Sequence, residues 1–517
     1  MRLILHIGQH KTGSKALQTA LHANPELLAT AGYFYPSPLT SGDTPPRAWE
    51  RNHHALFVAL RRRVEMGCAG DLPPAAQTNT PAALSETLRA LLRQTRDPGQ
   101  TVILSSEDLF DMHTAHECEF DAGLVSLGAR ALGEACRELR VAPTLVCYLR
   151  RQDHALAAHY TQFIKGTQAH YMPLWRYLPR FAARFDYAWM IACWEQVFGA
   201  EAIKLRSYDH AAADGGIVRD FFTEILGITP PAPVVTDDPE AANISPSRDH
   251  VEYMRILNRR SSAGGSVLPR SSVLRSALRD PRPGAGGPAA WLSTKARALL
   301  LSRYASGNAR LAERYADVSA LADLSIAGDL ETPPPPDFLA DHRLIELDSL
   351  SRAAAQRSPA GLRKAIFIQP PSAHPLHQSL ARDILLGILG DPQTAPVILT
   401  RWTAHSALRH WRETAMLVLS APLDCGFTAR RALDLLRCRG TPIVLCVGSL
   451  PSNKHEHRSL QTLLRHVSLL LCSEASLASA LCQPLPLGAR PETRTGPAGN
   501  PAHFSLGQQL LESSKPR

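Results

Sequence analysis

Near the start of the chain, glycine, lysine and hydroxyl side chains are spaced as in a loop that binds an anion. The stretch His6–Gln18 reads HIGQHKTGSKALQ, so that Gly8 and Gly13 lie on either side of Lys11, and Ser14 follows. Glycine lets the backbone turn tightly, amide groups at the start of a helix point outward as donors, and a lysine adds a full positive charge. This spacing predicts the binding of a phosphate group.

The residues on either side of the loop indicate the elements that hold it. The apolar run Leu3–Ile7 predicts a short strand before the loop. A helix is expected to begin near Ser14, with Leu17, Ala20 and Leu21 on one face. Strand, glycine-containing loop and helix together form the outline of a phosphate-binding turn.

The order of residues in this loop differs from the Walker A loop of nucleotide kinases. That loop, G-x-x-x-x-G-K-[ST], has its lysine directly after the second glycine and a magnesium-binding hydroxyl after the lysine. Here Ser14 follows Gly13, and the lysine within the loop is Lys11. The segment instead resembles the 5′-phosphosulfate loop of sulfotransferases, in particular the bacterial group with G-x-x-K-T-G-[ST] after a first strand. The resemblance implies that the donor, 3′-phosphoadenosine 5′-phosphosulfate (PAPS), is bound by Gly8, Lys11, Thr12, Gly13, Ser14 and Lys15.

A second segment continues the same resemblance. The run Thr144–Leu149 predicts a strand that leads into Arg150 and then RQD, with Tyr160–Gln162 downstream. This looks like the Y-L-R-R-Q-D … Y-x-Q segment of the bacterial group, and it implies that Arg150 binds the 3′-phosphate of the donor. The family's serine, eight residues after the arginine, is Ala158 in this chain. One hydroxyl donor to that phosphate is therefore missing.

A carboxylate and two histidines are candidates for the base that takes the acceptor's proton. The run Thr101–Leu104 predicts a strand, and Ser105–Glu107 after it is similar to the S-S-E turn of the same group. Ligands enter open parallel sheets at the carboxyl ends of strands, so Glu107 is expected to act as general base. The alternative is that Glu107 only stabilises the dipole of a following helix. His53 and His54 are rival bases.

The resemblance covers about residues 1–320 and implies sulfuryl transfer to a hydroxyl or amine acceptor. In that reaction Lys11 would stabilise the leaving oxygen and Glu107 would activate the acceptor. No metal is expected, since the cluster His113–Cys118 lacks the spacing of a metal site. Two alternatives stay open: a P-loop nucleotide kinase-like enzyme, and a catalytically degenerate nucleotide-binding or scaffold protein, which Ala158 supports.

Length, charge and cysteine usage limit the class of protein. The 517 residues exceed one ordinary domain of about 100–200 residues. A net charge of +9 suits anionic ligands, and we expect a nucleotide rather than a nucleic-acid partner. Ten cysteines without a C-x-x-C pair predict reduced thiols in a cytoplasmic protein. No apolar run reaches the roughly 18 residues of a membrane span.

Alternating strand-like and helical patterns predict the α/β class, with a P-loop-type parallel sheet sandwiched by helices and a second, smaller Rossmann-like domain. The expected boundaries are a sulfotransferase-like domain over 1–325, a Pro-rich linker over 326–360, the Rossmann-like domain over 361–489 and a disordered tail over 490–517. Ser261–Gly287 is expected to be a loop. The smaller domain resembles one half of a two-Rossmann-domain glycosyltransferase, which implies a carbohydrate acceptor.

Further strands are predicted from short apolar runs rich in β-branched residues. One lies in the first half, at Ala202–Leu205. In the second half a helix is expected at Thr428–Arg437, and the strands are expected at Ala365–Ile368, Val397–Leu399, Met416–Leu419, Ile443–Val447 and Val467–Leu471.

Overall fold

The structure, a computed structural model of the chain, describes residues 1–39, 52–68, 81–95, 97–113, 119–166, 168–231, 246–265, 267–280, 291–326, 339–355, 363–368, 375–389, 391, 394–399, 414–420, 443–447, 460, 463–464, 467–472 and 492–495. The chain divides into two units, which are described separately here. The first contains Met1–Gln168, Met172–Asn243 and Ala289–Pro333, and the second contains Ala169–Tyr171, Ile244–Pro288 and Pro334–Arg517.

The first unit is built on a parallel sheet of five strands in the order β2-β3-β1-β4-β5. The strands are β1 (Arg2–His6), β2 (Tyr33–Phe34), β3 (Thr101–Ser105), β4 (Ala142–Leu149) and β5 (Ile203–Ser207). In the register, Leu3 of β1 lies opposite Val102 of β3 on one side and Pro143 of β4 on the other. The carboxyl ends of three adjacent strands, β3, β1 and β4, therefore meet at one edge of the sheet.

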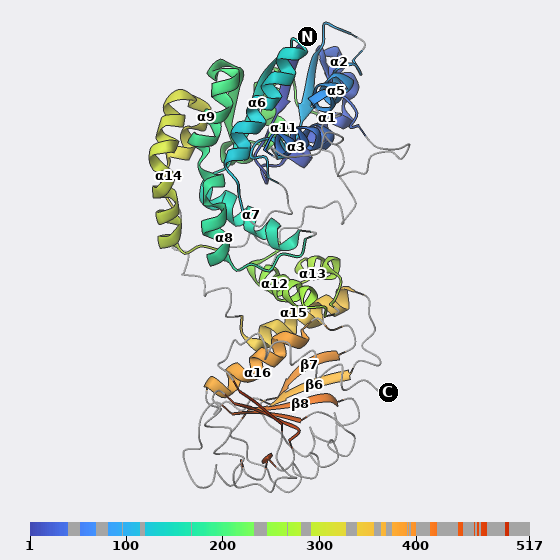
Figure 1. Cartoon of the computed structure of the whole chain (residues 1–517), viewed down its shortest axis with the longest axis vertical. Helices are drawn as coiled ribbons and strands as arrows, with labels where there is room; N and C mark the ends of the chain where they lie inside the picture. The colour runs from blue at the N-terminus through green and yellow to red at the C-terminus, as the bar shows by residue number, and fades with distance from the viewer. Residues whose placement is uncertain are drawn as a thin grey trace. The chain divides into compact units, whose positions relative to one another are not determined.

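Helices surround this sheet, which confirms the α/β class expected from the alternating pattern. Figure 1 shows α14, α9 and α6 side by side, and α9 contacts both α14 and α6. The helices of the first unit are α1 (Ser14–Ala23), α2 (Pro25–Thr30), α3 (His54–Cys68), α5 (Pro81–Leu92), α6 (Gly123–Glu138), α7 (Gln152–Lys165), α8 (Leu174–Phe181), α9 (Tyr187–Phe198), α10 (Tyr208–Ala213), α11 (Ile217–Asp220) and α14 (Thr294–Arg314). Short 3₁₀ or π turns complete it: η1 (Glu107–Leu109), η2 (Ala182–Phe185), η3 (Ala200–Ala202), η4 (Phe221–Ile225) and η5 (Ala316–Ala322).

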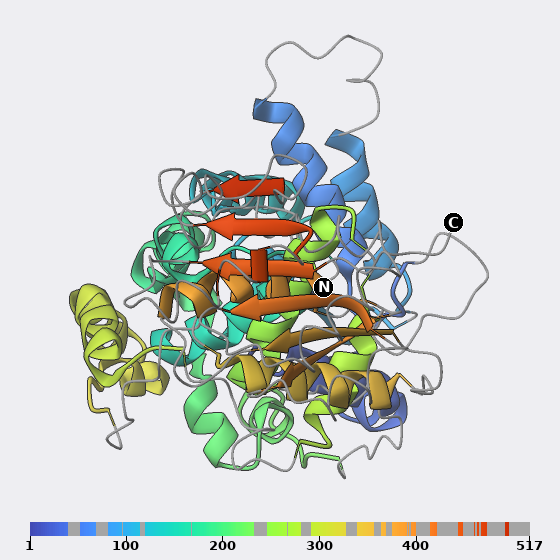
Figure 2. The same cartoon turned by 90° about the horizontal axis from the view of Figure 1, so that it is seen from below.

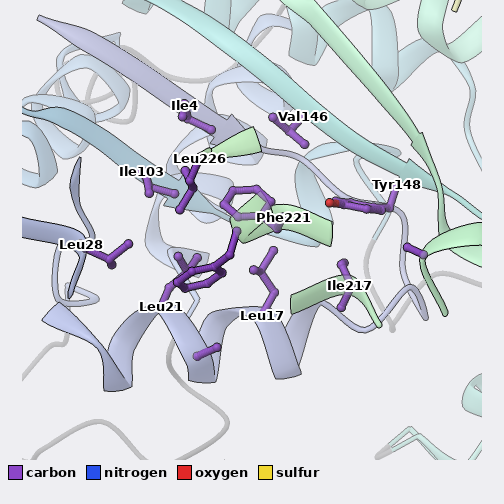
Figure 3. Packing of buried hydrophobic residues seen from close by; sticks show 13 residues of the cluster. Ile4, Leu17, Leu21, Leu28, Ile103, Val146, Tyr148, Ile217, Phe221 and Leu226 are labelled. Atoms are coloured by element: carbon purple, nitrogen blue, oxygen red, sulfur yellow. The ribbon is translucent and has the colours of Figure 1, made fainter. Parts of the chain in front are cut away.

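A buried apolar cluster fixes helix α1 against one face of the sheet. Leu17 and Leu21 of α1 point toward Phe221, and Ile4 and Val146 approach from two strands, as Figure 3 shows. Successive strand residues point to opposite faces, and the strand residues that enter this cluster are Ile4, Ile103, Val146 and Tyr148. Each such buried side chain stabilises the fold by about 1.5–3 kcal/mol. The packing holds the start of α1, and thus the end of the glycine-containing loop, at the carboxyl edge of the sheet.

The second unit contains another parallel sheet, of six strands in the order β11-β10-β9-β8-β6-β7. Figure 2 shows several of these strands lying side by side and pointing the same way. They are β6 (Arg363–Ile368), β7 (Thr394–Leu399), β8 (Thr414–Ser420), β9 (Ile443–Val447), β10 (Leu469–Cys472) and β11 (Glu492–Thr495), and helix α16 (Pro375–Ile388) contacts β7, β8 and β9. The order follows the doubly wound pattern in which the first strand of the sheet is second from the edge. The helix expected at Thr428–Arg437 lies outside the described residues.

Two expected connections in the second half contain helices instead. Helix α13 (Arg270–Ala277) lies inside the stretch expected to be a loop, after α12 (Arg248–Ser262), and α15 (Asp341–Ala354) lies inside the expected linker 326–360. The buried face of α13 includes serines, and Ser276 Oγ lies 3.2 Å from Ser351 Oγ of α15. Helix α13 buries small polar residues, so its sequence has no strong apolar period. The Gly-rich and Pro-rich residues around it therefore dominate the composition of the stretch, which is typical of a loop.

One strand also lies inside the tail that the composition predicts to be disordered. Strand β11 pairs in parallel with β10, with Glu492 opposite Leu469. All four of its side chains are exposed, as on a sheet edge that faces water on both sides. Strand β11 pairs through its backbone, and its sequence, ETRT, contains no apolar residue to reveal it.

The cysteines and helices that the structure describes allow two limited statements. The cysteines whose side chains the structure describes, Cys136, Cys147, Cys193, Cys446 and Cys472, are buried and form no disulfide. No helix within the described part of the chain has the length and apolar character needed to cross a membrane.

Candidate functional site

The loop between β1 and α1 has the backbone conformation of an anion cradle. Lys11 and Gly13 both have left-handed backbone angles, with φ of 70° and 79°. Thr12 Oγ1 donates to the carbonyl of Gln9 at 2.6 Å, which closes the turn. Ser14 Oγ at the start of α1 is buried without a hydrogen-bond partner. Its hydroxyl is thus an unsatisfied donor at the positive end of the helix dipole.

Both glycines of the loop are required by the packing around them. A Cβ atom on Gly8 would lie 2.5 Å from His6 Nε2 and 3.3 Å from Ser14 Oγ. A Cβ atom on Gly13 would lie 2.9 Å from Ile217 Cγ2, and the left-handed backbone there disfavours any side chain. The loop can therefore pass this close to its neighbours only with glycine at both positions.

Lys11 is half-buried and lies among other positive charges. Its Nζ is 3.5 Å from Gln162 Oε1 of α7. Burial, together with the charges of Lys165, Lys15 and Arg150, lowers the pKa of Lys11 to about 7, against a smaller opposing effect of Glu107. Several positive charges so close to one another favour the binding of a ligand that carries more than one negative charge.

Arg150, at the end of β4, reaches the same loop. Its Nη1 lies 3.4 Å from the carbonyl oxygen of Lys11, and its guanidinium carbon lies 5.3 Å from the centre of the Tyr208 ring. Arg150 Nε is buried without a hydrogen-bond partner. Within the described residues, no carboxylate forms an ion pair with Arg150, Lys11 or Lys15, although Glu107 and Asp209 interact electrostatically with Lys11 and Arg150 respectively. Arg150 and the loop, 139 residues apart, lie together as the sequence predicts.

The residues that follow Arg150 anchor helix α7 rather than face the loop. Arg151 Nε donates to Asp153 Oδ1 at 2.9 Å, and Arg297 of α14 donates to the other oxygen of Asp153 at 2.7 Å. Gln152 and Asn308, also of α14, exchange two amide hydrogen bonds. The R-Q-D part of the motif thus has a structural role, because it fixes the helix that begins beside Arg150.

Ala158 lies on the same face of α7 as two residues that interact with Lys11. Gln162 and Lys165 follow it by four and seven positions, which places all three along one side of the helix. Gln162 contacts Lys11 and the charge of Lys165 lowers the pKa of Lys11. The position of the missing serine therefore lies on the side of α7 that is turned toward the loop.

Glu107 lies at the neighbouring strand end and is held by helix α1. It begins the short helix η1 after β3, and Gln18 Nε2 donates to Glu107 Oε2 at 2.8 Å and to Ser105 Oγ at 3.1 Å. The negative charge of Glu107 partly offsets the lowering of the Lys11 pKa by burial and adds to the raising of the His54 pKa by Asp108. The carboxylate is thus close enough to the loop to influence its charge.

The two rival histidines have different environments. His53 Nδ1 accepts from the amide of Ser105 at 2.9 Å, so its Nε2 carries the hydrogen that is donated to the carbonyl of Pro36 at 3.1 Å. Both ring nitrogens are occupied, and burial lowers the pKa of His53 to about 4. His53 is therefore a structural residue. His54 is half-exposed, with Nδ1 at 3.0 Å from Asp108 Oδ2, and this hydrogen bond raises its pKa. His54 therefore stays a rival base.

Several contributors to the site lie outside the motifs of the sequence. Lys165 follows Ala158 at helical spacing, and this period could have identified it as a third lysine near the loop. Gln9 and Tyr187 contact each other at 2.7 Å across 178 residues, and no local pattern could have paired them. Within the described ranges, no three His, Cys, Asp or Glu side chains are placed to hold a metal ion. Of the cluster His113–Cys118 only His113 is described, and it is buried against Phe181.

Comparison with known proteins gives a distant likeness among solved structures. No protein-family model and no curated protein matches the chain. Among solved structures, the chain is similar to the crystal structure of a sulfotransferase from Alicyclobacillus acidocaldarius, with 16% sequence identity and a TM-score of 0.27. The match covers 53% of this chain and 98% of that chain. The function is therefore inferred from the residues of the site.

Proposed function

We propose that the first unit is a sulfotransferase that transfers a sulfuryl group from PAPS to a hydroxyl or amine acceptor. The observation that carries the proposal is the convergence of two cationic groups at adjacent strand ends: the loop with Lys11 after β1, and Arg150 after β4. One nucleotide with charged groups at its 5′ and 3′ positions needs two such groups. The loop would take the 5′-phosphosulfate and Arg150 the 3′-phosphate.

The residues of the loop supply the electrostatic part of the proposed reaction. Sulfuryl transfer breaks the bond between sulfur and the bridging oxygen of the donor and forms a bond between sulfur and the acceptor atom. Lys11 stabilises the negative charge that remains on the departing phosphate, and the amides at the start of α1 hold that phosphate in place. Glu107 takes the proton of the acceptor. The product nucleotide is 3′-phosphoadenosine 5′-phosphate.

The competing functions differ from this proposal at particular residues. A nucleotide kinase of the Walker type would need a lysine directly after Gly13, where the chain has Ser14. A degenerate nucleotide-binding or scaffold protein would keep the loop and lose a ligand contact, and Ala158 is such a loss. A carbohydrate acceptor and a cytoplasmic location stay predictions from the sequence.

A transfer screen with radiolabelled donor tests the proposed activity. Wild-type protein would be incubated with ³⁵S-labelled PAPS and a panel of glycans, lipids and small phenols, with the Lys11→Ala variant as the matched control. We expect a labelled product that the variant does not form at the same rate. Equal labelling by both proteins would refute a role of the loop in transfer, and a scaffold would label nothing while still binding the nucleotide.

Binding of the product nucleotide should depend on pH through Lys11. In the free protein Lys11 has a pKa of about 7, so it loses its charge as the pH rises above 7. A bound phosphate favours the charged amine and raises that pKa, so binding above pH 7 takes up a proton. Affinity should fall by up to about tenfold per pH unit between pH 7 and 9, where the phosphates are already ionised. Titration calorimetry in buffers of different ionisation enthalpy measures the proton uptake.

The Lys11→Arg variant is the control for this pH dependence. Arginine stays protonated throughout the range, so the variant should bind without proton uptake and with a flat pH profile. If wild-type protein also binds without taking up a proton at pH 8, Lys11 does not contact the bound phosphate.

The Ala158→Ser variant tests the departure from the family pattern. Because position 158 shares its helical face with Gln162, a serine there should add one charge-assisted hydrogen bond to the 3′-phosphate. The gain should be about 1.5–3 kcal/mol at most for 3′-phosphoadenosine 5′-phosphate. It should vanish for adenosine 5′-phosphate, which has a 3′-hydroxyl. If the serine variant improves neither and Arg150→Ala also changes nothing, the 3′-phosphate is not bound at this place.

A further inference from the structure

Three residues join the anion-binding loop to the strand end that carries Arg150. Gln9 Nε2 donates to Tyr187 Oη at 2.7 Å, Tyr187 Oη donates to the carbonyl of Arg150 at 2.7 Å, and the amide of Arg150 donates to Gln9 Oε1 at 3.0 Å. The hydrogen bonds form a closed ring, called here the Gln9–Tyr187–Arg150 ring. Gln9 and Tyr187 are buried, with 3% and 1% of their surfaces exposed.

Each polar atom in this ring has a fixed role. The amide of Arg150 can only donate, so the atom of Gln9 that faces it is the oxygen, and the nitrogen of Gln9 must face Tyr187. Burial raises the pKa of Tyr187, so its hydroxyl keeps the proton that it donates to the Arg150 carbonyl. None of the three residues can turn without leaving a buried donor or acceptor unpaired, and that outcome is costly.

The ring connects the two halves of the proposed nucleotide site. Its hydrogen bonds are made within the protein and not to either phosphate of the nucleotide. The backbone carbonyl of Gln9 also accepts a hydrogen bond from the Thr12 hydroxyl, and this bond ties Gln9 to the loop. Tyr187 is the first residue of α9, and Arg150 is the first residue after β4. The ring therefore couples the loop to the backbone from which the Arg150 guanidinium projects.

We propose that Gln9 and Tyr187 are positioning residues that hold the loop and Arg150 at a fixed separation, and that they thereby select nucleotides with phosphates at both the 5′ and 3′ positions. This inference rests on the proposed function, in which those two phosphates occupy the two cationic groups. When two binding groups are held at the spacing of the ligand, the second contact costs little additional ordering. A ligand with one phosphate gains nothing from that spacing.

The experiment compares the affinities of two nucleotides for the wild-type full-length protein and for its Tyr187→Phe variant. This substitution removes the hydroxyl of Tyr187 and keeps its aromatic side chain. The probes are 3′-phosphoadenosine 5′-phosphate and adenosine 5′-phosphate, measured by titration calorimetry. For the first nucleotide we expect Kd to rise about tenfold, the usual effect of breaking a buried hydrogen-bond network. For the second we expect a change of less than about twofold, because it needs only the loop.

Two further variants make the test specific. Gln9→Met should have the same selective effect, and the double variant should be no worse than either single one, since opening the ring once removes its function. Tyr304→Phe is the matched control, because Tyr304 Oη also donates to a backbone carbonyl, that of Ala182, at 2.7 Å. It should leave the preference between the two nucleotides unchanged.

The outcomes separate the inference from the function on which it rests. If wild-type protein prefers the bisphosphate and Tyr187→Phe and Gln9→Met keep that preference, the positioning role is refuted and the sulfotransferase proposal stands. The same conclusion follows if both variants weaken the two nucleotides equally, since that is general loosening of the fold. If wild-type protein shows no preference for the bisphosphate, the proposed function fails, and the positioning role fails with it.

Discussion

Replacing Lys11 by alanine is expected to lower the rate of sulfuryl transfer by about 10²- to 10³-fold, the usual cost of losing one preorganised group that stabilises charge in a transition state. Lys11 has a left-handed backbone inside the loop, and its amine is half-buried beside Gln162. An amine held there meets the charge that develops on the departing phosphate. Initial rates at saturating donor measure the loss.

Lys15→Ala is the matched control for this effect. Lys15 lies on the second position of α1, and its side chain is exposed. Its charge acts through water and is screened by salt, so its removal should change the rate by no more than about tenfold. Equal losses in the two variants would show that the loop lysine is not the group that stabilises the departing phosphate.

The Glu107→Gln variant should lose about 10²- to 10⁴-fold in turnover, as expected when a general base is removed. Glutamine keeps the size of the side chain and one acceptor oxygen for the amide of Gln18, so the short helix after β3 should remain folded. The donor nucleotide should bind almost unchanged, because Glu107 acts on the acceptor. A large fall in kcat with unaltered nucleotide affinity is therefore the signature.

The His54→Gln variant distinguishes the rival base. His54 has a pKa raised by its hydrogen bond to Asp108, so a His54 base would be protonated and inactive at low pH. If His54 is the base, the rate of the wild-type protein should fall at low pH as His54 becomes protonated, and the His54→Gln variant should lack this fall. In that case Glu107→Gln should have little effect. If Glu107 is the base, His54→Gln should keep the wild-type pH profile.

Much of the first unit could be predicted because its function-related residues lie at strand ends. Apolar runs locate β1, β3 and β4, and a parallel sheet places their carboxyl ends at one edge, so the strand ends that carry Gly8, Glu107 and Arg150 follow from local patterns without knowledge of any long-range contact. The structure places Arg150 against the loop and Glu107 beside α1. The proposed roles of these residues await the experiments above.

The rest of the site depends on contacts that no local pattern encodes. The pairing of Gln9 with Tyr187 is a tertiary contact between a loop and a distant helix. The assignment of His53 to a structural role required the positions of Ser105 and Pro36, which fix the hydrogens of its ring. A histidine on a helix has the same sequence signature whether its nitrogens are occupied or free.

The second unit shows the same limit at the level of secondary structure. Its apolar strands were expected close to where they lie, with β9 at the predicted Ile443–Val447. Helix α15 was hidden by the Pro-rich composition before it, although Leu344 and Leu347 are buried at helical spacing. The composition of a long segment therefore gives the wrong prediction for α15, where a local helical period of apolar residues is present. The edge strand β11 has no apolar period that could predict it.

The most direct test of the central claim is calorimetric titration of the full-length protein with 3′-phosphoadenosine 5′-phosphate and with ATP, each with and without magnesium. We expect the bisphosphate to bind without added magnesium, because the loop and Arg150 supply cations and amide donors and the loop lacks the Walker lysine and hydroxyl. Magnesium should not strengthen that binding. Magnesium-dependent binding of ATP, with no binding of the bisphosphate, would contradict the sulfotransferase assignment.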